Sequence, residues 1–315
     1  MKSLRIAYMG TPHFAIGPLE ALTKSKHQVV VVVTAADKKS GRGKKIHPSP
    51  VKTFSQNNQL PLLQPTNLKD PDFIDQLSAF KPDIIVVVAF RMLPREVWEL
   101  PPYGTFNLHA SLLPQYRGAA PIHWAVINGE TETGVTTFFI DQHIDTGAVI
   151  AQKKIDIQAN ETTGSLSAKL ESLGSGLVVD TVNMIASNQV TPQPQIYSEN
   201  LKSAPKLFKV NTRIDWTKSG NEIERLIRGL HPSPTAWTQL INNGDSQICK
   251  IHEAVFEPCD HKNSNGSIFI EDKQIFVNAI GGVLKIYKIQ LPNKKSLNSK
   301  ELLNGFSFSE NAYFV

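Results

Sequence analysis

Short apolar runs alternate with amphipathic stretches through the first 188 residues of the chain. Two of these runs, 29–33 and 84–89, are continuous and consist almost entirely of valine and isoleucine, and a third, 4–9, is apolar apart from Arg5. Such runs predict strands that are buried on both faces, and the helical spacing between them predicts crossover helices. We therefore expect an α/β fold with an open, mostly parallel, doubly wound sheet. Further strands are expected at 105–109, 135–140 and 148–154, and helices at 14–22, 72–80, 97–100, 119–128 and 163–187.

The pattern changes after residue 188. Residues 189–208 contain three prolines and few apolar side chains, so we expect a semi-extended linker between a domain at 1–188 and a domain at 209–315. The second domain begins with an expected helix at 222–230. Five short strands with Gly, Asn and Asp turns follow, and they suggest a small C-terminal β-barrel of the oligonucleotide-binding (OB) type. These strands are expected at 236–240, 247–256, 266–270, 274–279 and 283–289.

Length and composition agree with two domains and exclude several classes of protein. A chain of 315 residues with 41% hydrophobic residues can bury two cores. Its longest apolar runs are far shorter than the ~20 residues that a membrane helix needs, and its N-terminus lacks the pattern of a signal or transit peptide. Cys249 and Cys259 lack the spacing of a zinc site or a disulfide framework. We expect a cytoplasmic, monomeric protein with no membrane partner and no metal.

The net charge of +5 is concentrated in one short segment. Residues 37–45 hold five basic residues and one acid, Asp37, and therefore carry a net charge of +4. Gly41 and Gly43 disfavour a helix, so we expect a flexible basic finger that can fit a curved polyanion. The alternative is an ordinary solvated loop, which is the commoner meaning of a charge run. The basic residues are Lys38, Lys39, Arg42, Lys44 and Lys45.

Candidate chemistry first appears at the end of the strand 105–109. Asn107 and His109 lie on the same face of that strand, because alternate side chains share a face. An amide can donate to a developing oxyanion, and an imidazolium can donate as well or pass a proton, which suits acyl-type transfer. The alternative is a structural histidine that bonds a backbone carbonyl.

A second candidate is the turn 141–147, which contains two carboxylates and His143 after an apolar strand. An aspartate close to His109 would hold the imidazole charged and oriented. Asp-Thr-Gly is also a good turn sequence without any catalytic role. Spacing alone does not choose between Asp141 and Asp145.

Residues 107–121, with the sequence NLHASLLPQYRGAAP, resemble the signature of the folate-dependent formyltransferases. Within that superfamily the chain is most similar to the methionyl-tRNA branch, and the resemblance covers nearly its whole length. The SLLPxYRG core of the signature is highly specific. The other segments that carry the resemblance are 10–15, the basic finger, 204–216 and 228–237.

The resemblance implies both a reaction and roles for matching residues. The formyl group of 10-formyltetrahydrofolate would pass to the α-amino group of methionyl-initiator tRNA, with Asn107, His109 and Asp145 as the catalytic residues. The basic finger would contact the acceptor stem, and the C-terminal barrel would hold the tRNA further along. Phe14 would line a pocket for the methionine side chain, unless it only packs at a helix start. The folate site would be lined by Ser111, Leu112, Leu113 and Pro114.

Three segments depart from the family pattern. Residues 90–94 replace a more common loop with Tyr and Gly that flanks the folate ring, so we expect different folate contacts there. His143 stands where the family often has a small or unbranched residue. Residues 292–295 replace a Gly-containing turn in the last barrel hairpin.

Three other functions are compatible with parts of the sequence. A formyltransferase for an amino-sugar nucleotide or a purine precursor would need neither the basic finger nor the barrel. A formyltetrahydrofolate hydrolase would share Asn107, His109 and an aspartate but would need no RNA-binding domain. A non-catalytic RNA-binding protein would leave Asn107, His109 and the SLLP segment unexplained.

Overall fold

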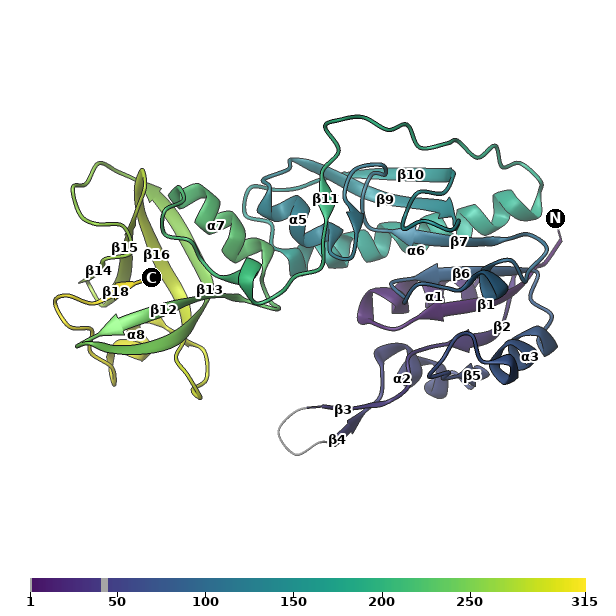
Figure 1. The fold of residues 1–315 in the computed structure, drawn as a ribbon, viewed down its shortest axis with the longest axis horizontal. Helices are drawn as coiled ribbons and strands as arrows, with labels where there is room; N and C mark the ends of the chain where they lie inside the picture. Colours follow the sequence, from purple (N-terminus) through teal and green to yellow (C-terminus); the bar gives the residue numbers. More distant parts are fainter. Residues whose placement is uncertain (1, 41–44) are drawn as a thin grey trace. The chain divides into compact units, whose positions relative to one another are not determined.

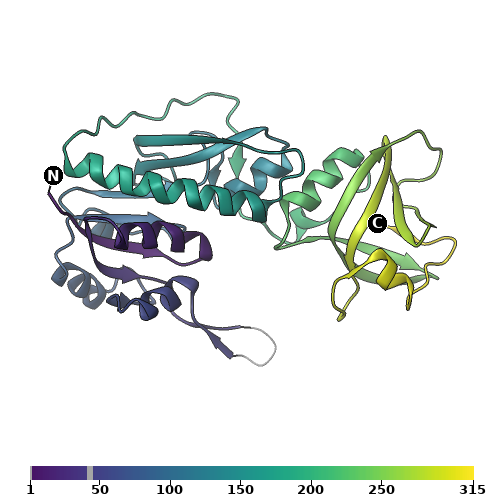
Figure 2. The same cartoon turned by 180° about the vertical axis from the view of Figure 1, so that it is seen from behind.

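A computed structural model describes residues 2–40 and 45–315, and the chain divides into two compact units (Figures 1 and 2). Unit 1 comprises residues 1–118, 132–155 and 167–203, and unit 2 comprises 119–131, 156–166 and 204–315. Two short segments, 119–131 and 156–166, therefore belong to unit 2 although they lie between segments of unit 1 in the sequence. The domain borders expected from sequence, at 188 and 209, remain a proposal.

Unit 1 is built on a seven-stranded sheet with the order β10-β9-β7-β6-β1-β2-β5. The pairs β7–β6, β6–β1, β1–β2 and β2–β5 are parallel, and β7–β9 is antiparallel. An α/β unit with a mostly parallel sheet is therefore confirmed. The strands are β1 (Arg5–Gly10), β2 (Gln28–Val33), β5 (Leu62–Leu63), β6 (Ile84–Val88), β7 (Thr105–His109), β9 (Glu132–Phe139) and β10 (Val149–Asp156).

Helices cover both faces of this sheet, which explains why its central strands are apolar throughout. Ala7 and Met9 of β1 belong to one core with Phe73 and Leu77 of helix α3 (Pro71–Ala79). Figure 2 shows helices α6 and α1 side by side across the other face. The remaining helices of this unit are α1 (Ile16–Thr23), α2 (Pro50–Asn57), α4 (Arg95–Trp98) and most of α6 (Thr163–Ala186).

Several local elements of unit 1 differ from the sequence prediction. The expected helix at 14–22 begins only at Ile16, and His13–Ala15 forms a 3-10 turn before it. Helix α2 and strand β5 were not predicted, because both are short and α2 is largely polar. The basic finger contains two short antiparallel strands, β3 (Lys38–Ser40) and β4 (Lys45–His47).

Unit 2 is an antiparallel barrel that follows the order β14-β15-β16-β13-β12-β18. An antiparallel bridge between Ser267 and Tyr313 joins the two ends of this order. The expected β-barrel class is therefore confirmed, and its core includes Ile251, Ile275 and Leu284. The elements are α5 (Pro121–Ile127), α7 (Gly220–Gly229), β12 (Ala236–Asn242), β13 (Asp245–Pro258), β14 (Ile268–Glu271), β15 (Gln274–Ala279), β16 (Gly282–Gln290), β17 (Leu297–Asn298), α8 (Ser299–Leu303) and β18 (Tyr313–Phe314).

The segment after α6 is extended and stays close to unit 1. Gln193 and Val149 pair through both backbone hydrogen bonds, each 2.8 Å long, so the segment runs beside β10. Further along, β11 (Ser203–Ala204) pairs with β8 (Arg117–Gly118). The expected linker therefore has ordered contacts with the segments that surround the catalytic candidates. Among residues 2–40 and 45–315, no helix is both long and apolar enough to cross a bilayer.

Candidate active site

The end of β7 presents Asn107 and His109 in very different environments. The His109 side chain is buried, and its Nε2 lies 2.8 Å from the carbonyl oxygen of Tyr116. A carbonyl can only accept a hydrogen bond, so Nε2 carries a proton. Asn107 is half-buried, and its amide has no hydrogen-bond partner among the described residues. The end of β7 therefore carries one polar side chain without a hydrogen-bond partner among the described residues, Asn107, and one that is already hydrogen-bonded, His109.

Asp145 lies beside His109, with its Oδ2 3.7 Å from the Nδ1 of the imidazole. That distance suits an ion pair but is too long for a direct hydrogen bond. The same Oδ2 accepts a hydrogen bond from the backbone N–H of Gly118 at 2.9 Å. The carboxylate is therefore anchored by one backbone group while it faces the imidazole.

Asp141 has a different role in the same turn. Its carboxylate accepts hydrogen bonds from the backbone N–H of His143 at 2.9 Å and from the hydroxyl of Thr146 at 2.8 Å. Asp141 therefore stabilises the turn, and the structure places Asp145 next to His109. Spacing alone left this choice open, because it depends on how the turn folds back toward β7, whereas the family resemblance implied Asp145.

The residues expected to line a folate site form a tightly bonded loop. The Ser111 hydroxyl donates to the carbonyl of Gln115 at 2.6 Å, and the Ser111 carbonyl accepts from the Thr136 hydroxyl at 2.6 Å. Ser111 and Leu113 are buried, whereas Leu112 and Pro114 are half-buried. Of the four residues, only Leu112 and Pro114 thus present substantial side-chain surface to a ligand.

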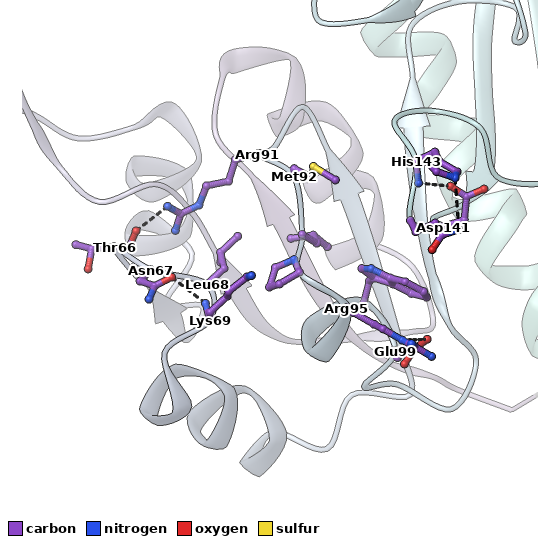
Figure 3. A pocket seen from close by; sticks show the side chains of 14 residues that line it. Thr66, Asn67, Leu68, Lys69, Arg91, Met92, Arg95, Glu99, Asp141 and His143 are labelled. Carbon is purple, nitrogen blue, oxygen red and sulfur yellow. Dashed lines mark hydrogen bonds and ion pairs between the residues drawn. The ribbon is translucent and has the colours of Figure 1, made fainter.

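A pocket of about 750 Å³ opens in unit 1 (Figure 3). Its walls are 66–69, 91–95, Trp98, Glu99 and 141–143. The walls 66–69 and 91–95 follow the parallel strands β5 and β6, and ligands of open α/β sheets bind outside the carboxyl ends of such strands. The wall 141–143 follows β9, which is antiparallel to β7. Two of these walls, 90–94 and His143, coincide with departures of the sequence from the family pattern. The wall at 66–69 was not expected, because the short strand β5 was not predicted.

Arg91 connects two walls of this pocket. Its guanidinium donates hydrogen bonds to the backbone carbonyls of Pro65 and Thr66, the latter at 2.8 Å. Figure 3 shows Arg91 reaching across to Thr66, with Asp141 and His143 on the opposite side. Because the guanidinium holds two loops together, Arg91 sets the shape of the pocket.

The structure places the expected RNA-binding residues only in part. Lys38, Lys39 and Lys45 lie on the paired strands β3 and β4, and Arg42 and Lys44 fall outside the described residues. Phe14 is half-buried in the 3-10 turn before α1. None of the described contacts joins these residues to His109, so their roles remain expectations.

Unit 2 carries a group of basic and aromatic side chains within the segments 204–216 and 228–237, to which no binding role was assigned from the sequence. The Lys206 ammonium lies 5.7 Å from the ring centroid of Phe208, which is 59% exposed. Lys209 and Arg213 lie 5.1 and 5.6 Å from the ring of Trp237. Exposed rings beside cations can stack with bases and pair with phosphates.

Comparison with known proteins identifies the family to which this chain belongs. The sequence model of the formyl transferase family matches residues 4–182, and that of the formyl transferase C-terminal domain matches residues 206–307. The chain therefore belongs to the formyl transferases. The methionyl-tRNA formyltransferase of Flavobacterium johnsoniae is 50% identical over 312 residues and covers 99% of each chain. That of Bacteroides fragilis is 48% identical over 314 residues, covering 98% of this chain and 97% of the other. Within the family, this chain is thus one of the methionyl-tRNA formyltransferases.

Solved structures with lower identity share the fold. HypX from Aquifex aeolicus in complex with tetrahydrofolic acid has a TM-score of 0.65 and 18% identity. The match covers 96% of this chain and 47% of HypX, so this chain spans about half the length of that protein. The sugar 3N-formyltransferase WlaRD has a TM-score of 0.65 and 20% identity over 94% of this chain and all of the other.

Proposed function

We propose that this protein transfers the formyl group of 10-formyltetrahydrofolate to the α-amino group of methionyl-initiator tRNA. The observation that carries the proposal is the approach of Asp145 to His109 in unit 1, with Asn107 on the same strand as His109. His109 Nδ1 faces Asp145 Oδ2 at 3.7 Å, and the unpartnered amide of Asn107 lies two residues earlier on the same strand. The names of the relatives support the choice of acceptor.

The pocket beside this site is our candidate for the folate ring. Its volume of about 750 Å³ lies within the usual range of small-molecule sites. Its wall at 141–143 lies two residues before Asp145 in the chain, so the pocket and the carboxylate that faces His109 share one turn. The tetrahydrofolic acid bound by HypX, which has the same fold, supports a folate ligand.

The reaction needs stabilisation of one developing charge and removal of one proton. The neutral amine attacks the formyl carbon, a new C–N bond forms, and the π electrons of the carbonyl move to its oxygen. Asn107 donates a hydrogen bond to this oxyanion, which is worth about 2.7–4 kcal/mol for a typical oxyanion donor. The ammonium group of the intermediate gives its proton to Asp145, directly or through one water. The carbonyl then re-forms as the bond from carbon to N10 breaks, and the proton held by Asp145 passes to N10, directly or through water, as tetrahydrofolate leaves.

His109 can stabilise the same intermediate, but it must first give up the hydrogen bond that it makes in the substrate-free protein. The Nε2–H that could donate to the oxyanion is bonded to the Tyr116 carbonyl. Hydrogen bonds at catalytic groups often rearrange when substrate binds. We propose that binding of the formyl donor opens this bond and that Asp145 stabilises the positive charge on the imidazole.

Formyl transfer is tested directly with a labelled donor. The protein is mixed with methionyl-tRNA and 10-formyltetrahydrofolate that carries label in the formyl group. We expect label on the methionine that is esterified to the tRNA, and no transfer when an amino-sugar nucleotide replaces the tRNA. Release of labelled formate without any acceptor would instead indicate a hydrolase, and labelling of the sugar would indicate a different acceptor.

A further inference from the structure

We infer that Gln195 is a positioning residue that holds the Asp145 turn against His109. The inference rests on the proposed catalytic role of Asp145. It concerns a residue in the extended segment after α6, which was expected to serve only as a linker.

Gln195 is the one inward-facing residue of its neighbourhood. In the stretch 191–200 all other residues are exposed, whereas Gln195 is partly buried. The backbone pairing of Gln193 with Val149 fixes where the segment crosses the start of β10. The Gln195 side chain is thereby directed at the turn that precedes β10.

Every hydrogen-bonding position of the Gln195 amide is used. Its Nε2 donates to the backbone carbonyls of Asp145 at 2.9 Å and Gly147 at 2.8 Å. Its Oε1 accepts from Nε of Arg117 at 3.0 Å and from the terminal Nη2 of Arg117 at 2.7 Å. A primary amide has two N–H donors and two acceptor positions. The partners at one end only accept and those at the other only donate, so the orientation of the amide is determined.

The turn that Gln195 binds needs such support. Asp145 has a φ of +55°, a left-handed backbone conformation that costs energy for a residue with a side chain. Gly147 lies so close to Phe139 that a Cβ would stand 1.7 Å from the Phe139 carbonyl oxygen. Gln195 bonds the carbonyls of both residues and so holds the turn in this conformation.

The contact with Arg117 relates the turn to the histidine. Arg117 is followed by Gly118, whose N–H binds the Asp145 carboxylate, and preceded by Tyr116, whose carbonyl binds His109. Gln195 therefore joins the two chain segments that hold Asp145 and His109. Without this connection the turn can move relative to β7, and the 3.7 Å separation is no longer fixed.

Replacing Gln195 should impair turnover rather than substrate binding. In Q195M the side chain keeps its length but loses both donors and the acceptor. We expect kcat to fall up to about 100-fold, the effect of displacing a catalytic group by about 1 Å. The KM values for folate and tRNA should stay close to wild type, because Gln195 does not line the pocket.

The neighbouring glutamine provides a matched control. Gln193 lies in the same segment, but its side chain bonds only the carbonyl of Thr191, at 3.2 Å. Q193M should therefore keep wild-type kcat. A second variant, Q195E, keeps an acceptor for Arg117 but has no donor for the two turn carbonyls, and it should lose kcat as Q195M does. If Q195M does not fold, Q195E carries the test.

A double-mutant cycle separates positioning from a general structural role. If Gln195 acts through Asp145, then Q195M combined with D145A should be no slower than D145A alone. Additive losses, or wild-type kcat in a folded Q195E, would overturn the inference. Near-normal turnover of D145A would instead refute the proposed function, so the two failures can be told apart.

Discussion

At the level of single residues, the amide of Asn107 and the imidazole of His109 differ in whether they already have a hydrogen-bond partner. Asn107 has no hydrogen-bond partner among the described residues, whereas the Nε2 of His109 is bonded to Tyr116 and its Nδ1 faces Asp145. A free donor near a reacting carbonyl needs no reorganisation, which is the condition for effective oxyanion stabilisation. The imidazole of His109, in contrast, must give up its hydrogen bond to Tyr116 before it can donate to the reacting carbonyl.

The catalytic assignment predicts large effects on turnover with little effect on folding. His109→Ala and Asp145→Ala should each lower kcat by orders of magnitude, and Asn107→Ala by about 100- to 1000-fold. Rates of formyl transfer under saturating substrate measure these effects, and thermal melting shows whether the variants fold. Near-normal turnover of a folded His109 or Asp145 variant would contradict the assignment.

The two cysteines predict a clear difference in thiol reactivity. Burial raises the pKa of the Cys249 thiol to about 12, so almost no thiolate forms there at pH 8. Cys259 is exposed. Iodoacetamide at pH 8 should therefore modify Cys259 alone, and peptide mass spectrometry would locate the label. In denaturant both thiols should react; rapid labelling of Cys249 in the native protein would show that this side of the barrel core opens easily.

At the level of elements, the proposed roles of the basic finger and of the Asp145 turn depend on the groups that these two segments contact. β3 and β4 form a paired stem for the finger, so Lys38, Lys39 and Lys45 lie on paired strands. The segment after α6 is a third example. Its proposed role in holding the Asp145 turn is evident only from its hydrogen bonds to that turn.

Neutralising the finger should weaken the use of tRNA. Replacement of Lys38, Lys39, Arg42, Lys44 and Lys45 by Gln should raise the KM for tRNA and flatten its dependence on salt, because each lost phosphate contact releases one counterion fewer. The KM for folate is the internal control and should not change. KM measured across a range of salt concentrations tests this, and an unchanged slope would mean that the finger is only a solvated loop.

At the level of the whole molecule, buried histidines link stability to pH. Burial lowers the pKa of His27, whose Nδ1 accepts from the N–H of Leu4 and whose Nε2 pairs with Asn183. Burial also lowers the pKa values of His123 and His252. These histidines therefore bind a proton less readily in the folded protein than in the unfolded chain, where they titrate near their ordinary value.

This difference predicts loss of stability in mild acid. Above pH ~6.5, the ordinary value for histidine, both states are neutral and stability is full. As the pH falls below it, the unfolded chain binds protons first, so the free energy of unfolding decreases. Urea titrations at pH 7.5 and 5.5 measure the change. His27→Gln should reduce the pH dependence, and an undiminished one would exclude His27 as a contributor.

Much of the fold and part of the site were predictable from local sequence. Continuous runs such as Ile84–Val88 indicate strands covered on both faces, and the sheet confirms this. The motif at 107–121 indicated the family, which the relatives confirm. Local patterns could do this because burial and strand alternation act over a few residues. They failed for the 3-10 turn at His13–Ala15 and for α2 and β5, where the apolar signal is short or weak.

Only the tertiary structure decided which groups meet. The 3.7 Å approach of Asp145 to His109, the bonding of Gln195 to the Asp145 turn, and the pocket wall at 66–69 all join residues far apart in the chain. Contacts of this kind depend on strand order and on how loops fold back over the sheet edge, and no periodicity in the sequence records them. The side chains were thus set by sequence, and their chemistry by the sheet that brings them together.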